Sequence, residues 1–217
     1  MKTKLCIFDL DGTLTDSLRD LADSMNYAIQ KHGFPPRPTG EYRYMVGNGI
    51  SVLADRAAGL DENSNPDVKR KILEDFGAYY ELHKLDNTRP FDGMSELIRK
   101  LKELGIKLAV NSNKNDNFTY DIVTTLFGKD CFSDIRGKRD GVNAKPDPSA
   151  ALSIIENAGV KKEECIYIGD SNVDIRTAKN ADIRSIGVCW GFRTKEELMQ
   201  EGADYIAEIP EDVLKFI

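Results

Sequence analysis

The most informative stretch of the sequence is Asp9-Leu10-Asp11-Gly12-Thr13-Leu14. It directly follows Lys4-Leu5-Cys6-Ile7-Phe8, a short apolar run that predicts a buried strand. Because side chains alternate between the two faces of a strand, Asp9 and Asp11 should point to the same side. Two poorly solvated carboxylates at a strand end require a cation or a shared proton. The stretch therefore favours a metal or catalytic site, with an Asp-Gly turn that merely ends a strand as the alternative.

The composition excludes several classes of function. A net charge of −6 over 217 residues gives no basic surface for nucleic acid. No run of about 18 apolar residues is present, and the N-terminus does not resemble a signal peptide, so neither a membrane span nor export is predicted. The four cysteines lie far apart without zinc spacing and are best interpreted as buried free thiols. We therefore expect a cytoplasmic protein without membrane partners.

The pattern of apolar residues divides the chain into two parts. Residues 16–86 predict helices and no convincing strand, whereas strands and helices alternate through residues 87–217. The expected strands in the second part are 106–110, 131–135, 164–168, 184–188 and 203–206, and the expected helices include 117–127, 148–158 and 172–181. This alternation predicts an α/β fold, a Rossmann-like, doubly wound parallel sheet.

We expect residues 1–15 and 87–217 to form this catalytic core, and residues 16–86 to form an inserted, all-helical cap domain. An insert after the first strand should lie over the carboxyl ends of the strands, where open α/β sheets bind ligands. The cap can then act as a lid, with hinges near residues 14–16 and 86–89.

Further polar residues follow the predicted strands. Ser112 comes after the second core strand, Lys145 precedes a helix, and Asp170 and Asp174 follow strand 164–168. Each has an ordinary explanation, because a lone serine or aspartate often caps a helix and a lone lysine is usually solvated. All of them, however, belong at carboxyl ends of neighbouring strands. Hard oxygen ligands at this density suit Mg²⁺.

With these residues assembled, the sequence resembles the haloacid dehalogenase superfamily of aspartate-based phosphohydrolases. The resemblance covers the whole chain, and the helical insert is similar to the first type of cap in that family. Its four motifs match, in order, Asp9-Leu10-Asp11-Gly12-Thr13, Ser112, Lys145 and Gly169-Asp170-Ser171-Asn172-Val173-Asp174. The chain looks most like the phosphoglycolate phosphatase branch, through Lys145-Pro146-Asp147-Pro148, Trp190-Gly191 and Gly202-Ala203-Asp204-Tyr205.

The resemblance implies hydrolysis of a small phosphate monoester, with 2-phosphoglycolate favoured. In that mechanism Asp9 attacks phosphorus and forms an aspartyl-phosphate, while Asp11 protonates the leaving oxygen and later deprotonates water. Ser112 would hold phosphate oxygens, and Lys145 would offset the negative charge.

The remaining site residues are also implied by the resemblance. Gly12, Thr13 and Asn113 would surround the substrate phosphate. Mg²⁺ would be held by Asp9, Asp11, Asp170 and Asp174, with Asp11 contributing its backbone carbonyl.

The sequence determines the substrate least well. Arg43, just before Gly47-Asn48-Gly49, is a candidate to bind a substrate carboxylate, with a solvated surface arginine as an equal alternative. A pyrophosphatase, a nucleotide phosphatase or a sugar phosphatase remains open. Phosphosugar mutases of the superfamily usually carry a histidine and an arginine where this chain has Leu21 and Ile50, which disfavours mutase activity.

A function of another class is a non-catalytic, phosphate-sensing module on the same fold. It would be favoured if a nucleophile or metal ligand were missing, and none is. We expect a small phosphorylated metabolite as the ligand, and a monomer or homodimer.

Overall fold

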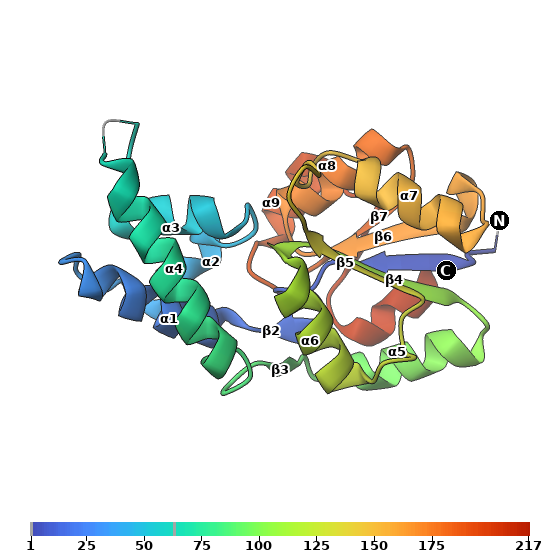
Figure 1. Ribbon diagram of the computed structural model, residues 1–217. Helices are drawn as coiled ribbons and strands as arrows, with labels where there is room; N and C mark the ends of the chain where they lie inside the picture. Colours follow the sequence, from blue (N-terminus) through green and yellow to red (C-terminus); the bar gives the residue numbers. More distant parts are fainter. Residues whose placement is uncertain (1, 63) are drawn as a thin grey trace.

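The structure is a computed structural model that describes residues 2–62 and 64–217. A parallel sheet with helices on both faces forms one part, and helices α1–α4 form a second group beside it (Figure 1). The strands are β1 Leu5–Phe8, β2 Thr15–Asp16, β3 Arg89–Pro90, β4 Lys107–Asn115, β5 Asp134–Lys138, β6 Cys165–Gly169, β7 Arg184–Val188 and β8 Tyr205–Ala207. The α-helices are α1 Leu18–Lys31, α2 Tyr42–Met45, α3 Ile50–Ala58, α4 Pro66–His83, α5 Met94–Glu103, α6 Asp116–Phe127, α7 Ser149–Ala158, α8 Asn172–Ala181 and α9 Lys195–Glu201. Short 3₁₀ helices are η1 Thr39–Glu41, η2 Lys162–Glu164 and η3 Pro210–Lys215.

The sheet has the strand order β5-β4-β1-β6-β7-β8, and its neighbouring strands are parallel. Strand β1 lies in the middle, where Phe8 is in register with Val110 of β4 and Ile168 of β6. The order of the strands reverses at β1, so the loops after β1, β4 and β6 diverge and leave a crevice at the carboxyl ends. The predicted doubly wound parallel sheet is confirmed.

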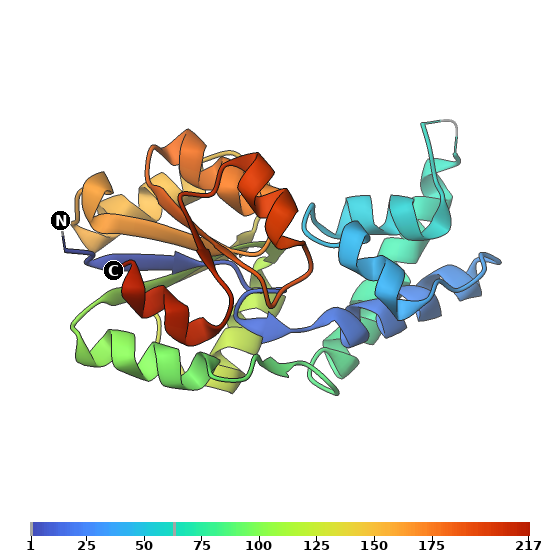
Figure 2. The ribbon, with the colours of Figure 1, turned by 180° about the vertical axis from the view of Figure 1, so that it is seen from behind.

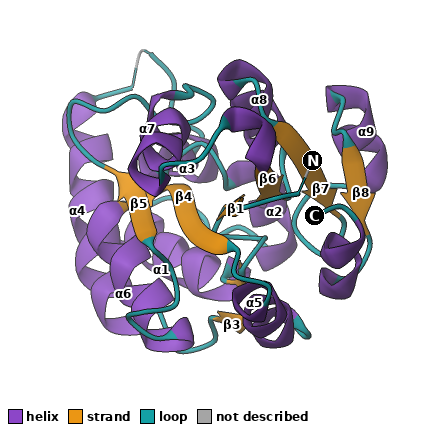
Figure 3. Cartoon of the chain, turned by 90° about the vertical axis from the view of Figure 1, so that its right-hand side faces the viewer, coloured by secondary structure: helices purple, strands orange, loops and turns teal. Residues whose placement is uncertain are grey.

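The side chains of β1 explain why helices cover both faces. Cys6 and Phe8 belong to the core cluster that includes residues of α5 and α6, whereas Leu5 and Ile7 pack with residues of α7 and α8. All four side chains are fully buried, which is why the strand is a continuous apolar run and does not alternate with polar residues. The end-on view shows the sheet between these two helical layers (Figure 3).

Helices α1–α4, called the cap below, lie beyond the carboxyl ends of the strands, and both chain termini lie at the opposite end of the sheet (Figures 1 and 2). The six-stranded sheet and the helices that cover it are called the core. The chain crosses between the two parts through β2 and β3, which pair antiparallel with Thr15 opposite Pro90. Asp20, in the first turn of α1, is buried and accepts hydrogen bonds from the backbone N–H groups of Asn87 and Thr88. The two crossings are therefore tied together by a hydrogen-bonded carboxylate.

Three predicted strands differ by two or more residues from the observed ones, and strand 164–168 is shifted by one residue to β6. Strand 106–110 continues as β4 to Asn115, because its polar end pairs with β5, Asn111 opposite Arg136 and Asn115 opposite Lys138. The strand predicted at 131–135 is instead β5, Asp134–Lys138, and that predicted at 203–206 is β8, Tyr205–Ala207. The apolar pattern ends before the backbone pairing does in β4, and it begins before the pairing does in β5 and β8. The two differ because backbone hydrogen bonding does not require apolar side chains.

The cysteines are all free, as predicted, but Cys131 and Cys189 are only partly buried. Within the described part of the chain, no helix has the length and apolar character that a membrane span requires.

Candidate active site

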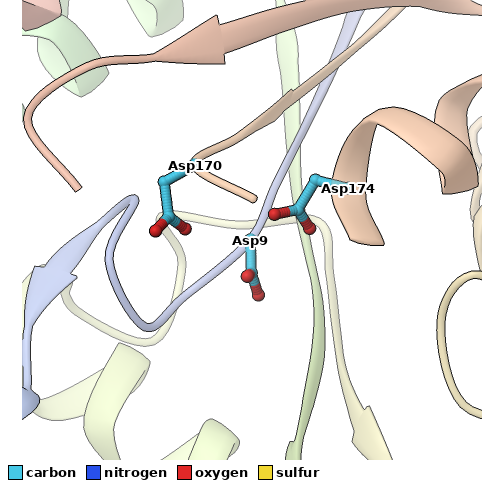
Figure 4. A group of neighbouring side chains, drawn as sticks. All are labelled: Asp9, Asp170 and Asp174. Carbon is cyan, nitrogen blue, oxygen red and sulfur yellow. The ribbon is translucent and has the colours of Figure 1, made fainter. Parts of the chain in front are cut away.

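Three aspartates converge at the carboxyl end of the sheet (Figure 4). Asp9 follows β1, Asp170 follows β6, and Asp174 lies in the first turn of α8. Each offers one carboxylate oxygen to a group whose members lie within 4.8 Å of one another, and all three residues are buried. These are three of the four residues that the sequence assigned to the metal.

Lys145 supplies the positive charge nearest to this group. Its Nζ lies 2.8 Å from Asp9 Oδ1 and 2.7 Å from Asp174 Oδ1, and its side chain is 2% exposed. Burial by itself lowers the pKa of this ammonium group, but the charges of Asp174 and Asp9 outweigh burial and hold the pKa well above its usual value. Lys145 therefore carries its positive charge beside Asp9 and Asp174.

Without a further cation the carboxylates are not fully compensated. Burial, followed by the charge of Asp174, raises the pKa of Asp9 to about 8 despite the nearby Lys145. Burial and Asp174 likewise raise the pKa of Asp170 to about 7, although Phe192 N–H and the Thr13 hydroxyl donate to its two oxygens at 2.8 and 3.1 Å. Desolvation and mutual repulsion are the causes that a bound cation would remove.

Two glycines allow the backbone to approach Asp170 closely. Gly12 has φ of +86°, and a Cβ there would lie 2.4 Å from Asp170 Oδ2. At Gly191, after β7, a Cβ would lie 2.3 Å from both Asp170 Cβ and the Gly12 carbonyl oxygen. Any larger residue at either position would displace the Asp170 carboxylate. Gly12 thus shapes the site through its backbone.

Asp11 is held apart from the three clustered carboxylates. Lys114 Nζ donates to both Asp11 carboxylate oxygens at 2.8 Å, and the Ser17 hydroxyl donates to Oδ1 at 2.5 Å. Lys114 comes from β4, whereas Ser17 is the N-cap of α1. Asp11 therefore connects the sheet to the first cap helix. Its side chain does not join the metal group, so any contribution to metal binding must come from its backbone.

Asn113 links the core to the cap through its amide. Its Nδ2 donates to the Gly47 carbonyl in the cap at 2.9 Å and to the Lys145 carbonyl at 3.1 Å, while its Oδ1 accepts from Lys145 N–H at 2.8 Å. The neighbouring Ser112 hydroxyl accepts from Lys114 N–H at 3.3 Å and is buried. Asn113 thus fixes the backbone of Lys145 and the position of the cap loop.

A cavity of about 280 Å³ lies between the sheet and helices α1, α3 and α4. Asp9, Asp11 and Ser112 line it, together with Asn113 and Lys114. The two aspartates of the first motif thus face the same cavity, which is the arrangement expected for a nucleophile and a proton donor acting on the same group.

Not every residue assigned from the sequence faces this cavity. Arg43, on α2, is exposed and is not among the lining residues, so the structure does not place it where it would bind a substrate carboxylate. Thr13 also does not line the cavity, because its hydroxyl is directed to Asp170. The exposed position of Arg43 follows from its place on a single-turn helix that turns its buried side, Tyr42, inward.

The sequence analysis assigned neither Lys114 nor Ser17 to the site. The signal for Lys114 was its spacing, because a strand extended beyond Val110 would place residues 112 and 114 on one face. The hydroxyl of Ser17 makes no capping bond and is used by Asp11 instead. Nothing in the local sequence distinguishes that use from capping.

The donor set fits a hard divalent cation. When all three carboxylates are ionised, as a bound cation would favour, they and the one ammonium group of Lys145 together carry a charge of −2, and the ligand atoms are oxygens. Asp9, Asp170 and Asp174 are the residues that would hold the ion.

Known proteins resemble this chain over most of its length. Residues 6–188 match the family model described as haloacid dehalogenase-like hydrolase. A phosphoglycolate phosphatase of Vibrio vulnificus is 33% identical, with 94% of this chain and 92% of that protein covered, and one of Agrobacterium fabrum is 35% identical over 87% and 81%. A crystal structure from Lactobacillus delbrueckii subsp. bulgaricus, described as a candidate phosphoglycolate phosphatase, has a TM-score of 0.92 at 33% identity, covering 100% of this chain and 99% of that one.

Proposed function

This chain belongs to the haloacid dehalogenase-like hydrolases and is a phosphoric monoester hydrolase, and from that premise we propose that it uses Mg²⁺ and an aspartyl-phosphate intermediate to hydrolyse a small phosphate monoester. The observation that carries the proposal is the shared cavity of Asp9 and Asp11 next to the three-carboxylate group. The names of the relatives make 2-phosphoglycolate the reference substrate.

The chemistry follows from the positions of the two aspartates. An Asp9 carboxylate oxygen attacks phosphorus, and the bond from phosphorus to the alcohol oxygen breaks. Asp11 gives that oxygen a proton, so that the product leaves as an alcohol. Water then attacks phosphorus of the aspartyl-phosphate while Asp11 accepts its proton, which releases phosphate and restores Asp9. Both residues line the same cavity, so a single bound ester can reach them.

The surrounding residues support these steps. Lys145 contacts Asp9 at 2.8 Å and offsets the charge that phosphate brings. Ser112 lines the cavity with its hydroxyl beside the end of β4, where it can donate to a phosphate oxygen. Mg²⁺, held by Asp9, Asp170 and Asp174, would keep Asp9 ionised and neutralise charge on the transferring group.

The cap argues against a second phosphate in the substrate. Leu21 and Ile50, which stand where related mutases have a histidine and an arginine, both line the cavity. Neither offers a hydrogen bond or a charge to a second phosphate. A monoesterase is therefore supported better than a mutase or a pyrophosphatase. The free cysteines support a reducing compartment such as the cytoplasm.

The test is Mg²⁺-dependent release of phosphate from 2-phosphoglycolate and p-nitrophenyl phosphate by wild type, Asp9→Asn and Asp11→Asn. Asp9→Asn should lose activity at least about a thousandfold on both esters and form no acyl-phosphate. Asp11→Asn should still be phosphorylated by p-nitrophenyl phosphate, because that leaving group needs little protonation, but should release phosphate slowly. An acyl-phosphate that persists in Asp9→Asn, or a folded wild type that hydrolyses neither ester, would refute the proposal.

A further inference from the structure

The two walls of the active-site cavity differ in chemistry. The core contributes carboxylates, amides, a hydroxyl and an ammonium group, whereas the side chains from the cap are hydrocarbon apart from the Tyr80 hydroxyl. The apolar side chains around the cavity include Leu21, Ile50, Leu53, Leu73, Phe76 and Phe118, the last from the core helix α6. In a phosphatase the phosphate must lie against the core wall, because the nucleophile is there. The alcohol part of the ester then faces the apolar wall.

Among the described residues that line the cavity, no cation is free to receive a second anionic group. Lys114 is the only cationic side chain among the described residues that line the cavity, and both of its contacts with Asp11 are 2.8 Å. Its Nζ also lies over the ring of Tyr80, 4.9 Å from the centroid. The Asn113 amide is likewise committed to Gly47 and Lys145. A substrate carboxylate would therefore lose its hydration without gaining a cationic partner. The Tyr80 hydroxyl has no hydrogen-bond partner among the described residues, but it is neutral and buried, and a neutral donor offsets a buried carboxylate less than a charged one does.

The apolar wall also has the shape of an aromatic site. Phe76 and Tyr80 of α4 stack at 5.1 Å with an interplanar angle of 15°, and Tyr80 meets Phe118 of α6 edge-on at 5.2 Å. This group spans the junction of cap and core, so a ring bound there would contact both. A dry apolar cavity of about 150 Å³ accommodates benzene. The 280 Å³ here can therefore hold a phosphate group and one ring.

We propose that this enzyme selects phosphate monoesters of apolar alcohols, alkyl or aryl, and discriminates against esters whose alcohol carries a carboxylate. The inference rests on the proposed phosphatase function and concerns the part of the substrate that this function leaves open. The hydrolysis is unchanged, since water supplies the oxygen that phosphorus gains and the alcohol leaves with a proton. Selection acts through the fit of the alcohol to the cap wall.

A series of alkyl phosphates tests the proposal without changing the type of leaving group. The substrates are 2-phosphoglycolate, its uncharged carboxamide of nearly equal size, propyl phosphate and benzyl phosphate. Specificity constants should be at least tenfold higher for the carboxamide than for 2-phosphoglycolate, and tenfold higher again for benzyl than for propyl phosphate. Each buried methylene contributes about fourfold. A preference for 2-phosphoglycolate over its carboxamide would overturn the proposal while leaving the phosphatase function intact.

Three variants connect the preference to the wall. Leu53→Ala removes apolar contact and should lower the specificity constant for benzyl phosphate about tenfold, with little change for 2-phosphoglycolate. Ile50→Arg places a cation at a partly buried cavity position and should reduce or reverse the discrimination against 2-phosphoglycolate. Val68→Ala, on α4 but not lining the cavity, is the matched control and should change neither ratio. If Leu53→Ala and Val68→Ala behave alike in folded protein, the wall does not select the alcohol.

A binding measurement separates this inference from the phosphatase proposal. Benzylphosphonate and phosphonoacetate have a non-hydrolysable bond to phosphorus, and their affinities for wild type with Mg²⁺ can be measured by calorimetry. Benzylphosphonate should bind at least tenfold more tightly, even if no ester were hydrolysed. Equal affinity, or tighter binding of phosphonoacetate, would contradict the inference regardless of the result with esters.

Discussion

The core wall and the cap wall of the active-site cavity are stabilised in opposite ways. Asp9 in the core wall lies against Asp170, Asp174 and Lys145, which are buried next to the cavity without lining it, and there each charge loses hydration and is offset only by its neighbours. The cap wall gathers Leu53, Phe76 and similar side chains, whose burial is favourable in itself. The residues proposed to carry out the reaction therefore lower the stability of the folded protein. The residues proposed to select the substrate raise it, because they also form the hydrophobic core of the cap.

This difference determines which amino-acid substitutions each wall tolerates. A substitution in the core wall leaves a buried charge without its partner, so few residues are tolerated there. Apolar residues of similar volume replace one another in the cap wall at a cost usually below about 1.5 kcal/mol. The reaction can thus stay fixed while the alcohol that the enzyme accepts varies.

The largest expected effect is the loss of activity when Asp170, next to the core wall, is substituted. Asp170→Asn preserves shape and the bond from Phe192 N–H, but an amide is a poor ligand for a hard cation. Activity should fall at least about a thousandfold at saturating Mg²⁺, because the metal neutralises the transferring group. Leu53→Ala in the cap wall should lower activity only for large apolar esters. Initial rates with p-nitrophenyl phosphate and a thermal melt of each variant provide the comparison, and an active Asp170→Asn would remove this residue from the metal site.

The same contrast separates what the sequence could predict from what it could not. Asp9, Lys145, Asp170 and Asp174 stand at fixed places after strands or at a helix start, so strand order alone brings them together. In the structure Lys145 contacts both Asp9 and Asp174, and the three carboxylates lie close together.

The cap wall depends on how α1, α3 and α4 rotate and cross, and one sequence does not specify such packing. Arg43 illustrates the consequence, since it lies near the cap loop in sequence but on the outside of α2. Lys114 was missed for a related reason, because the apolar pattern ends at Val110 while β4 continues to Asn115.

A second, smaller effect should appear in the stability of the metal-free protein. The pKa values of Asp9, about 8, and Asp170, about 7, lie above the ordinary value of 3.8, so between about pH 4 and pH 8 the folded protein binds more protons than the unfolded chain. Stability contributed by these protonated groups is present below pH 4 and is lost as pH rises towards 8. The melting temperature without metal should therefore fall over this range.

Bound Mg²⁺ should oppose this fall in melting temperature, because the cation stabilises the ionised carboxylates and so lowers their raised pKa values. Mg²⁺ at about a hundred times its dissociation constant should raise the melting temperature by roughly 5–10 °C. The increase should be larger at pH 8 than at pH 5, where protons compete for the ligands. Differential scanning calorimetry of wild type and Asp170→Asn measures both effects. An equal increase in the two proteins would show that the ion binds elsewhere.

The smallest expected effect concerns another contact between core and cap, in addition to the one through Asn113. Arg193, in the core after β7, donates to the backbone carbonyls of Arg43 and Val46 in the cap, the latter at 3.1 Å, and its guanidinium lies over the ring of Tyr44 at 4.9 Å. Such partly exposed contacts are each worth about 1 kcal/mol or less.

Arg193→Ala should therefore loosen the cap without changing the reacting groups, so KM should rise about three- to tenfold while kcat changes less than twofold. Arg193→Lys should restore little, because an ammonium group lacks the planar fork that reaches two carbonyls and stacks on an aromatic ring. Arg70→Ala on α4 is the matched control, since Arg70 pairs only with Asp67 and Glu74 of its own helix among the described residues. Hydrogen exchange of residues 42–46 should accelerate in Arg193→Ala and not in the control. If exchange accelerates while KM stays constant, the position of the cap does not control how tightly substrate is held, and the two walls act independently.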